Sequence, residues 1–125
     1  MKSSWFELYK ADKYRNKNMT CFLYHLRRAK GSNSCVSRCI SKLKLKIYRH
    51  FYGLEIYSET QIGKGFYIGH PYGITINPDA IIGENCNVHK GVVIGRENRG
   101  KRKGAPIIGN RVWIGINAAI VGNIK

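Results

Sequence analysis

The sequence predicts an all-β repeat solenoid preceded by a short basic α-helical segment. Two observations carry this prediction: aliphatic residues recur every six positions from residue 56 onward, and residues 1–52 combine helical spacing with most of the positive charge. A helical period of 3.6 or a strand period of 2 does not give a strict period of six, whereas stacked short strands and tight turns do. At 125 residues the chain has the length of one domain.

The six-residue period covers most of residues 54–125 and is interrupted twice. Its aliphatic residues are Ile56, Ile62, Ile68, Ile76, Ile82, Val88, Ile94, Ile108, Ile114 and Ile120, and glycine follows six of them. We expect the aliphatic side chains to point inward and the glycines to relax turns. Two extra residues fall between Ile68 and Ile76, and residues 96–104 form a polar run. These interruptions predict a bulge and an extruded loop, where function usually lies.

Residues 1–52 are predicted to form a basic helical segment, and residues 53–125 the repeat domain. Helical spacing is seen in residues 4–10 and 19–30, and a third helix is expected after the candidate N-cap Ser34 and before Gly53. This third helix carries one apolar stripe, formed by Val36, Ile40, Leu43, Ile47 and Phe51. Two interpretations remain open: residues 36–52 lie on an anionic membrane, or the stripe packs on the end of the solenoid as its cap.

The net charge of +15 predicts an anionic partner, although a solvated basic face explains it as well. Residues 1–52 hold thirteen basic and two acidic residues. No apolar run reaches the roughly 18 to 20 residues that cross a bilayer, and no signal peptide is recognisable. We therefore expect a cytoplasmic location, at the inner face of the plasma membrane if the membrane interpretation holds. The cysteines show no CxxC spacing, so neither a metal site nor a disulfide is expected.

Several motifs of the repeat region resemble hexapeptide-repeat acyltransferases. They are Glu55-Ile56, Ile62-Gly63-Lys64-Gly65, Gly69-His70-Pro71-Tyr72-Gly73, Val88-His89-Lys90-Gly91-Val92-Val93-Ile94-Gly95 and Ile108-Gly109-Asn110-Arg111-Val112-Trp113-Ile114-Gly115. The pattern is most similar to the serine acetyltransferase branch and its relatives that O-acetylate polysaccharides. The resemblance implies a left-handed parallel β-helix, usually a homotrimer, that moves an acetyl group from acetyl-coenzyme A to a hydroxyl. The sequence stops in mid-period at Lys125, from which we expect a C-terminally truncated domain.

His70 occupies the position of the family's general base. An alcohol needs a base to take its proton as it attacks a thioester, and histidine titrates near neutral pH. The family pairs this histidine with an acidic residue fifteen positions earlier, which here is Glu55. A carboxylate on one ring nitrogen would fix the tautomer that leaves the other nitrogen free to accept. The resemblance therefore implies His70 and Glu55 as the catalytic residues.

The acceptor is expected to be a sugar, because the chain departs from the serine acetyltransferase pattern. The family's arginine and histidine after the loop are replaced by Gly104 and Ala105, and its aspartate before the base by Gly69. We expect a lipid-linked or small sugar acceptor of a capsule, lipopolysaccharide or exopolysaccharide precursor, with His89 and Tyr72 binding the substrate. The alternative is a serine O-acetyltransferase of cysteine biosynthesis.

The coenzyme is expected between neighbouring subunits, beside the extruded loop. Its phosphates need cations, which Arg96, Arg99, Lys101, Arg102 and Lys103 provide, although a charge run is often only a solvated loop. The pantetheine arm needs a close approach to the backbone. Small residues that would allow it, and that also suit turns, are Gly95, Gly109, Gly115, Ala118 and Ala119.

Three rival functions remain open. A zinc-dependent hydratase needs three histidines around the metal, and the repeat region has His70 and His89; no metal is therefore expected. A non-enzymatic basic binding module on a trimeric solenoid would use the aromatic residues of the helical segment to stack bases, but no nucleic-acid motif accompanies them, so no nucleic acid is expected. An inactive relative would keep the motif without the activity.

Overall fold

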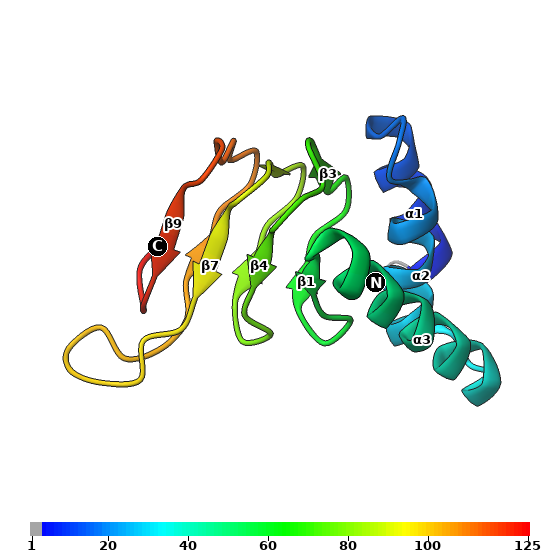
Figure 1. The fold of residues 1–125 in the computed structure, drawn as a ribbon, viewed down its shortest axis with the longest axis horizontal. Coiled ribbons are helices and arrows are strands. Elements are labelled where there is room, and N and C mark those ends of the chain that lie inside the picture. The colour runs from blue at the N-terminus through cyan, green and yellow to red at the C-terminus, as the bar shows by residue number, and fades with distance from the viewer. Residues whose placement is uncertain (1–3) are drawn as a thin grey trace.

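The computed structural model describes residues 4–125, which form three helices followed by nine short strands. The helices are α1 (Trp5–Arg15), α2 (Thr20–Gly31) and α3 (Cys35–Tyr52). They gather at one end of the molecule, and the strands coil away from them, with one long loop projecting near the far end (Figure 1). Residues 1–3 of the predicted helical segment lie outside the described residues. No helix in the described part of the chain is long and apolar enough to cross a membrane.

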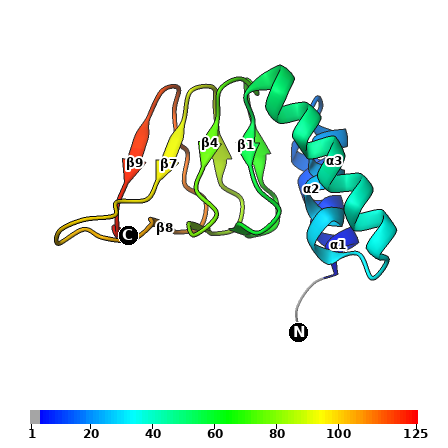
Figure 2. The same cartoon turned by 60° about the horizontal axis from the view of Figure 1, so that its bottom comes forward.

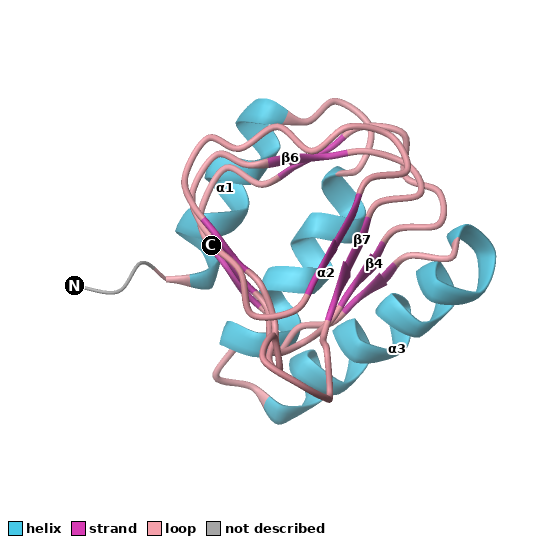
Figure 3. Cartoon of the chain, turned by 90° about the vertical axis from the view of Figure 1, so that its left-hand side faces the viewer, coloured by secondary structure: helices cyan, strands magenta, loops and turns pink. Residues whose placement is uncertain are grey.

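The strands are two or three residues long, and all of their pairings are parallel. They are β1 (Glu55–Ile56), β2 (Gln61–Ile62), β3 (Tyr67–Ile68), β4 (Thr75–Ile76), β5 (Ile81–Ile82), β6 (Asn87–Val88), β7 (Val93–Gly95), β8 (Ile107–Ile108) and β9 (Ala119–Val121). Consecutive strands enter different sheets, with orders β1-β4-β7-β9, β2-β5-β8 and β3-β6. Seen end-on, the strands lie along three sides of a coil (Figure 3). The predicted repeat of short parallel strands is therefore present.

The core of the coils follows the six-residue period. The aliphatic residues of the period are buried from Ile56 to Ile114, and Ile120 is half-buried. A second buried position lies two residues earlier in most repeats, which the period did not predict. Its members are Leu54, Thr60, Phe66, Ile74, Ala80, Cys86, Val92 and Pro106. Residues two apart on a strand share a face, so each short strand directs two side chains inward.

Both interruptions of the period appear where the sequence predicted them. Glu55 pairs with Thr75, and Thr75 pairs with Val93, so the first coil is two residues longer than the second. The extra residues form a bulge between β3 and β4. Val93 pairs with Ala119, a longer step that contains the projecting loop.

Helix α3 begins and ends at the predicted residues. The Ser34 side chain accepts a hydrogen bond from the Ser37 amide, and Gly53 adopts the left-handed conformation (φ 67°) typical of a helix C-terminus. Helix α1 extends to Arg15, further than its apolar spacing indicated. The helices lie against the first coil beside β1 (Figure 2).

Of the two interpretations of the apolar stripe of α3, the one in which it packs on the end of the solenoid is wrong. All five stripe residues are exposed, and α3 packs through another face that contains the buried Ser41 and Leu45. Ser41 Oγ accepts a hydrogen bond from Arg28 Nε at 2.6 Å and lies 3.1 Å from Nδ1 of His25. Burial, followed by the charges of Arg28 and Lys44, lowers the pKa of His25 below its ordinary value. A serine at the contact, rather than an apolar residue, hid this face from the apolar pattern.

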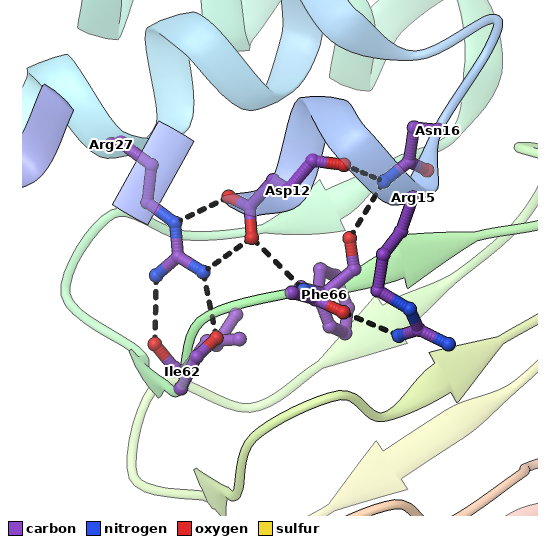
Figure 4. Close-up of polar contacts among 8 residues, drawn as sticks. Asp12, Arg15, Asn16, Arg27, Ile62 and Phe66 are labelled. Carbon is purple, nitrogen blue, oxygen red and sulfur yellow. Dashed lines mark hydrogen bonds and ion pairs between the residues drawn. The ribbon is translucent and has the colours of Figure 1, made fainter. Parts of the chain in front are cut away.

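A buried ion pair joins α1 and α2, and the same two side chains form hydrogen bonds with the first coil (Figure 4). Arg27 Nε donates to Asp12 Oδ2 at 2.7 Å, and both side chains are buried. Arg27 also donates to the carbonyls of Ile62 and Gly63 at 2.7 and 2.8 Å, and Asp12 accepts from the Phe66 amide at 2.9 Å. The strands of the first coil have a partner strand on one side, and buried backbone groups on the other side need partners of another kind. The helices supply them.

Candidate functional site

The bulge between β3 and β4 presents the His70 side chain to solvent. The Tyr72 amide donates to the His70 carbonyl at 3.0 Å and closes the turn. The Gly73 amide donates to the Tyr52 carbonyl at 2.9 Å, and the Gly91 amide donates to the Tyr72 carbonyl at 3.0 Å. The end of α3 and the next coil therefore both hold the bulge. This arrangement places an accessible imidazole on a fixed backbone, as a general base requires.

Glu55 lies at the same end of the sheet as the bulge. It is the first residue of β1 and pairs with Thr75, which directly follows the bulge segment. Its Oε2 accepts a hydrogen bond from Thr75 Oγ1 at 3.2 Å. In the described part of the chain no hydrogen bond joins Glu55 to His70. The structure thus brings the two predicted catalytic residues to one end of a sheet without engaging them with each other.

Tyr72 forms an aromatic contact between the bulge and α3. Its ring centroid lies 5.4 Å from that of Tyr52, which stacks on Tyr48 at 5.6 Å. Tyr72 is mostly exposed. Its role in binding a substrate stays a prediction.

His89 is the second histidine of the repeat, and its tautomer is fixed by a backbone contact. Its Nδ1 lies 2.9 Å from the Ile114 carbonyl. A carbonyl only accepts, so Nδ1 carries the proton and Nε2 is left as the acceptor. The half-buried ring also packs against Trp113 and Tyr67, at centroid distances of 4.7 and 6.0 Å. The sequence analysis gave Trp113 no role. The signal that points to it is its large aromatic side chain, in a repeat whose turns otherwise carry small residues.

The His89 ring also occupies the space beside Gly69. A Cβ atom built on Gly69 would lie 2.8 Å from His89 Nε2 and closer still to Cδ2. The position directly before His70 therefore has no room for a side chain while His89 keeps this orientation. Glycine stands here in place of the family's aspartate, and the His89 ring fills the space that the aspartate side chain would need.

Substituting Gly69 by alanine is expected to reduce the free energy of unfolding by about 1–3 kcal/mol, because the His89 ring must move. The same substitution in a His89→Ala background should be nearly neutral. Gly109→Ala is the matched control, since nothing lies within 4 Å of its Cβ position. Urea unfolding followed by circular dichroism is measured for five proteins: the wild type, Gly69→Ala, His89→Ala, the double variant and Gly109→Ala. Equal losses in the two Gly69→Ala proteins would contradict the proposed clash.

The projecting loop is ordered by its own polar contacts. Glu97 and Gly104 form an antiparallel bridge at its base, and the Glu97 carboxylate accepts from the amides of Asn98 and Arg99. Arg96 pairs with Asp79 at 3.0 Å, which leaves it engaged. The other loop cations are exposed, and within residues 4–125 they form no ion pair. They are Arg99, Lys101, Arg102 and Lys103.

A groove of about 280 Å³ lies at the base of this loop. Arg102 and Ala119, two of the predicted coenzyme residues, both line it, together with Glu97, Ile120, Val121 and Ile124. Gly95 pairs with Val121 in the same sheet, so it lies beside this groove. Gly109 follows β8, which belongs to another sheet. Gly115 lies under the Trp113 ring, and a Cβ atom built on Gly115 would lie 3.0 Å from that ring. The structure thus brings together some of the predicted coenzyme residues and separates others.

The bulge and the loop leave the same sheet at opposite ends. His70 precedes β4, whereas the loop follows β7, and β4 and β7 are parallel neighbours. Within one chain, His70 and the loop cations therefore lie at opposite ends of the sheet. Across residues 4–125 no three His, Cys, Asp or Glu side chains gather in a group suited to a metal ion.

Curated relatives of this chain are serine acetyltransferases. The protein of Staphylococcus epidermidis is 36% identical over 96 residues, which cover 77% of this chain and 43% of the relative. That of Staphylococcus aureus is 38% identical over 80 residues, covering 64% of this chain and 38% of the relative. The chain thus spans less than half the length of these relatives. No family model matches the sequence.

Solved structures of serine acetyltransferases share the fold. Isoform 3 from Entamoeba histolytica, in complex with cysteine, matches with a TM-score of 0.72 at 26% identity, over 95% of this chain and 48% of that one. The soybean enzyme complexed with serine matches with a TM-score of 0.70 at 23% identity, over 98% and 57% of the two chains. These matches include the helices, which lie outside the motifs of the repeat region. The chain is therefore similar to serine acetyltransferases in sequence and in fold.

Proposed function

We propose that this protein is an acetyl-coenzyme A-dependent O-acetyltransferase in which His70 is the general base. The observation that carries the proposal is the exposed His70 on a bulge held by α3 and the next coil, in a relative of acetyltransferases. Acetyl-coenzyme A supplies the activated acetyl group. His70 takes the proton from the acceptor hydroxyl as its oxygen bonds to the acetyl carbon, and the coenzyme leaves as a thiol. Glu55 orients the imidazole once substrate draws the two together.

The acceptor is proposed to be serine, which replaces the polysaccharide sugar expected from the sequence. The curated relatives and the solved structures that resemble this chain are named serine acetyltransferases. A sugar acceptor remains the second candidate because of one local observation: Gly69 has no room for the family's aspartate beside His89. His89 and Tyr72 are proposed to bind either acceptor.

The complete site is proposed to form between subunits of a homotrimer of left-handed coils. Residues 53–125 would provide the site, and residues 1–52 would close the first coil. Because His70 and the projecting loop lie at opposite ends of one sheet, the base of one subunit would work with the loop of the next. The loop cations and the groove beside Arg102 fit the phosphates and the arm of the coenzyme.

The test is a thiol-release assay of the purified protein with acetyl-coenzyme A and a panel of acceptors. We expect turnover with L-serine and none with D-serine or with hydroxyl-bearing sugars. Turnover restricted to sugars would overturn the serine assignment and leave the acetyltransferase proposal standing. No thiol release with any acceptor, from a folded trimer seen by sedimentation velocity, would overturn the proposed function.

A further inference from the structure

Helix α3 exposes a continuous apolar stripe on the outside of the molecule. The exposed fractions of its residues are 68% for Val36, 46% for Ile40, 60% for Leu43, 44% for Ile47 and 73% for Phe51. These residues are spaced by three or four positions and therefore share one face of the helix. The contacts described for the candidate active site do not involve this stripe, so its exposure needs a separate explanation.

The stripe is held outward by the opposite face of the same helix. Leu45 is buried, and the buried Ser41 is bound by Arg28 of α2. The Tyr48 ring packs on the buried Phe22 ring at a centroid distance of 5.2 Å. Turning the stripe inward would break all of these contacts. Its exposure is therefore a property of the folded chain.

The charges around the stripe are uniformly positive. Neither α2 nor α3 contains an aspartate or glutamate. At 100° per residue, Lys42 and Lys46 lie on one side of the stripe and Lys44 lies on the other. All three are exposed, and within the described chain none takes part in an ion pair. Two further cations of α3 are already engaged: Arg38 donates to the Ser32 carbonyl, and Arg49 lies over the Tyr57 ring.

The apolar stripe and the positive charges beside it together distinguish between two possible partners of this helix face, a second copy of α3 and a lipid surface. A second copy of α3 would bring lysines against lysines with no carboxylate on the helix to pair them, in a chain of net charge +15. An anionic lipid surface offers hydrocarbon to the stripe and phosphate groups to the flanking lysines. The charge pattern therefore favours lipid over self-association.

We propose that α3 binds the surface of an anionic membrane, lying in its plane with the apolar stripe in the headgroup region. The lysines on both sides then contact lipid phosphates. The first coil and α2 face away from the bilayer, because they pack on the other side of the helix. This interaction is independent of the proposed acetyl transfer and would position the coils beside the membrane.

Vesicle flotation tests the proposal with the full chain. We expect binding to vesicles of phosphatidylcholine and phosphatidylglycerol, and little binding to phosphatidylcholine alone. Replacing Val36, Leu43 and Phe51 by serine should lower the binding constant about tenfold or more, because the buried apolar area is lost. Replacing Lys42, Lys44 and Lys46 by glutamine should lower it by a similar factor through the lost attraction to phosphates.

The matched control for charge replaces Lys101, Arg102 and Lys103 of the projecting loop by glutamine, which removes the same net charge elsewhere. The matched control for the apolar change replaces Ile116, which is 50% exposed, by serine. Both controls should bind like the wild type, and circular dichroism confirms that every variant is folded. Equal losses from the loop and helix lysine variants would overturn the proposal in favour of attraction by net charge alone. A stripe variant that binds vesicles normally but changes the sedimentation coefficient would overturn it in favour of a second copy.

Discussion

Replacing His70 by alanine is expected to lower kcat/KM for acetyl transfer about 10²–10⁴-fold, the usual contribution of a positioned general base. The physical reason is that the attacking hydroxyl keeps its proton until a base accepts it. Because the His70 side chain is exposed and makes no hydrogen bond within residues 4–125, its loss should leave the fold unchanged. Thiol release from acetyl-coenzyme A measures the rate, with the acceptor that the panel identifies.

Two variants make this result specific to proton transfer. His70→Gln keeps a polar side chain of similar length but cannot act as a base at neutral pH, so its rate should fall as far as that of His70→Ala. His50→Ala removes an exposed histidine at the end of α3 and should keep the wild-type rate. A His70→Gln protein with near wild-type kcat would show that position 70 orients the substrate and accepts no proton.

Replacing Arg27 by alanine is expected to lower the free energy of unfolding by about 3–5 kcal/mol, as observed when one partner of a buried ion pair is removed. The change leaves the Asp12 carboxylate buried without its cation. It also leaves the carbonyls of Ile62 and Gly63 without their donor. Urea unfolding followed by far-ultraviolet circular dichroism gives the free energy.

An exposed ion pair of the same chain is the matched control. Arg96 and Asp79 lie 3.0 Å apart with their side chains 35% and 62% exposed, so Arg96→Ala should change the free energy of unfolding by only about 0–1 kcal/mol. If Arg27→Ala is as mild as Arg96→Ala, the contact between the helices and the first coil contributes little to stability. A loss of helical signal at low urea before the strands unfold would instead show that the helices detach separately.

The repeat and its interruptions were predictable because they depend on local spacing. A six-residue period of inward aliphatic residues is visible in any one coil, and an insertion has to leave the coil where it occurs. The bulge with His70 and the loop of residues 96–104 therefore appeared where the sequence placed them. The inward position that precedes each aliphatic residue by two was missed because its members range from Phe66 to Ala80 and Thr60, and no single residue type marks it.

The candidate site was predictable only in its parts. The resemblance supplied His70, Glu55 and the loop cations, and their roles stay predictions. Their assembly depends on which strands pair, because strand pairing brings Glu55 to the end of the sheet that carries His70 and puts the loop at the other end. The contact of His89 with Gly69 joins two coils and has no signal in the sequence around either residue.

The sequence alone determined the period, the helix ends at Ser34 and Gly53, and the existence of an apolar stripe on α3. Each of these depends on residues that are neighbours along the chain. Only the tertiary structure decided that the stripe faces outward. From the sequence pattern, α3 could pack either through the stripe or through the face that carries Ser41 and Leu45. Asp12 and Arg27 show the same limit: as sequence they are ordinary helix charges, and only the unpartnered backbone of the first coil makes them a buried pair.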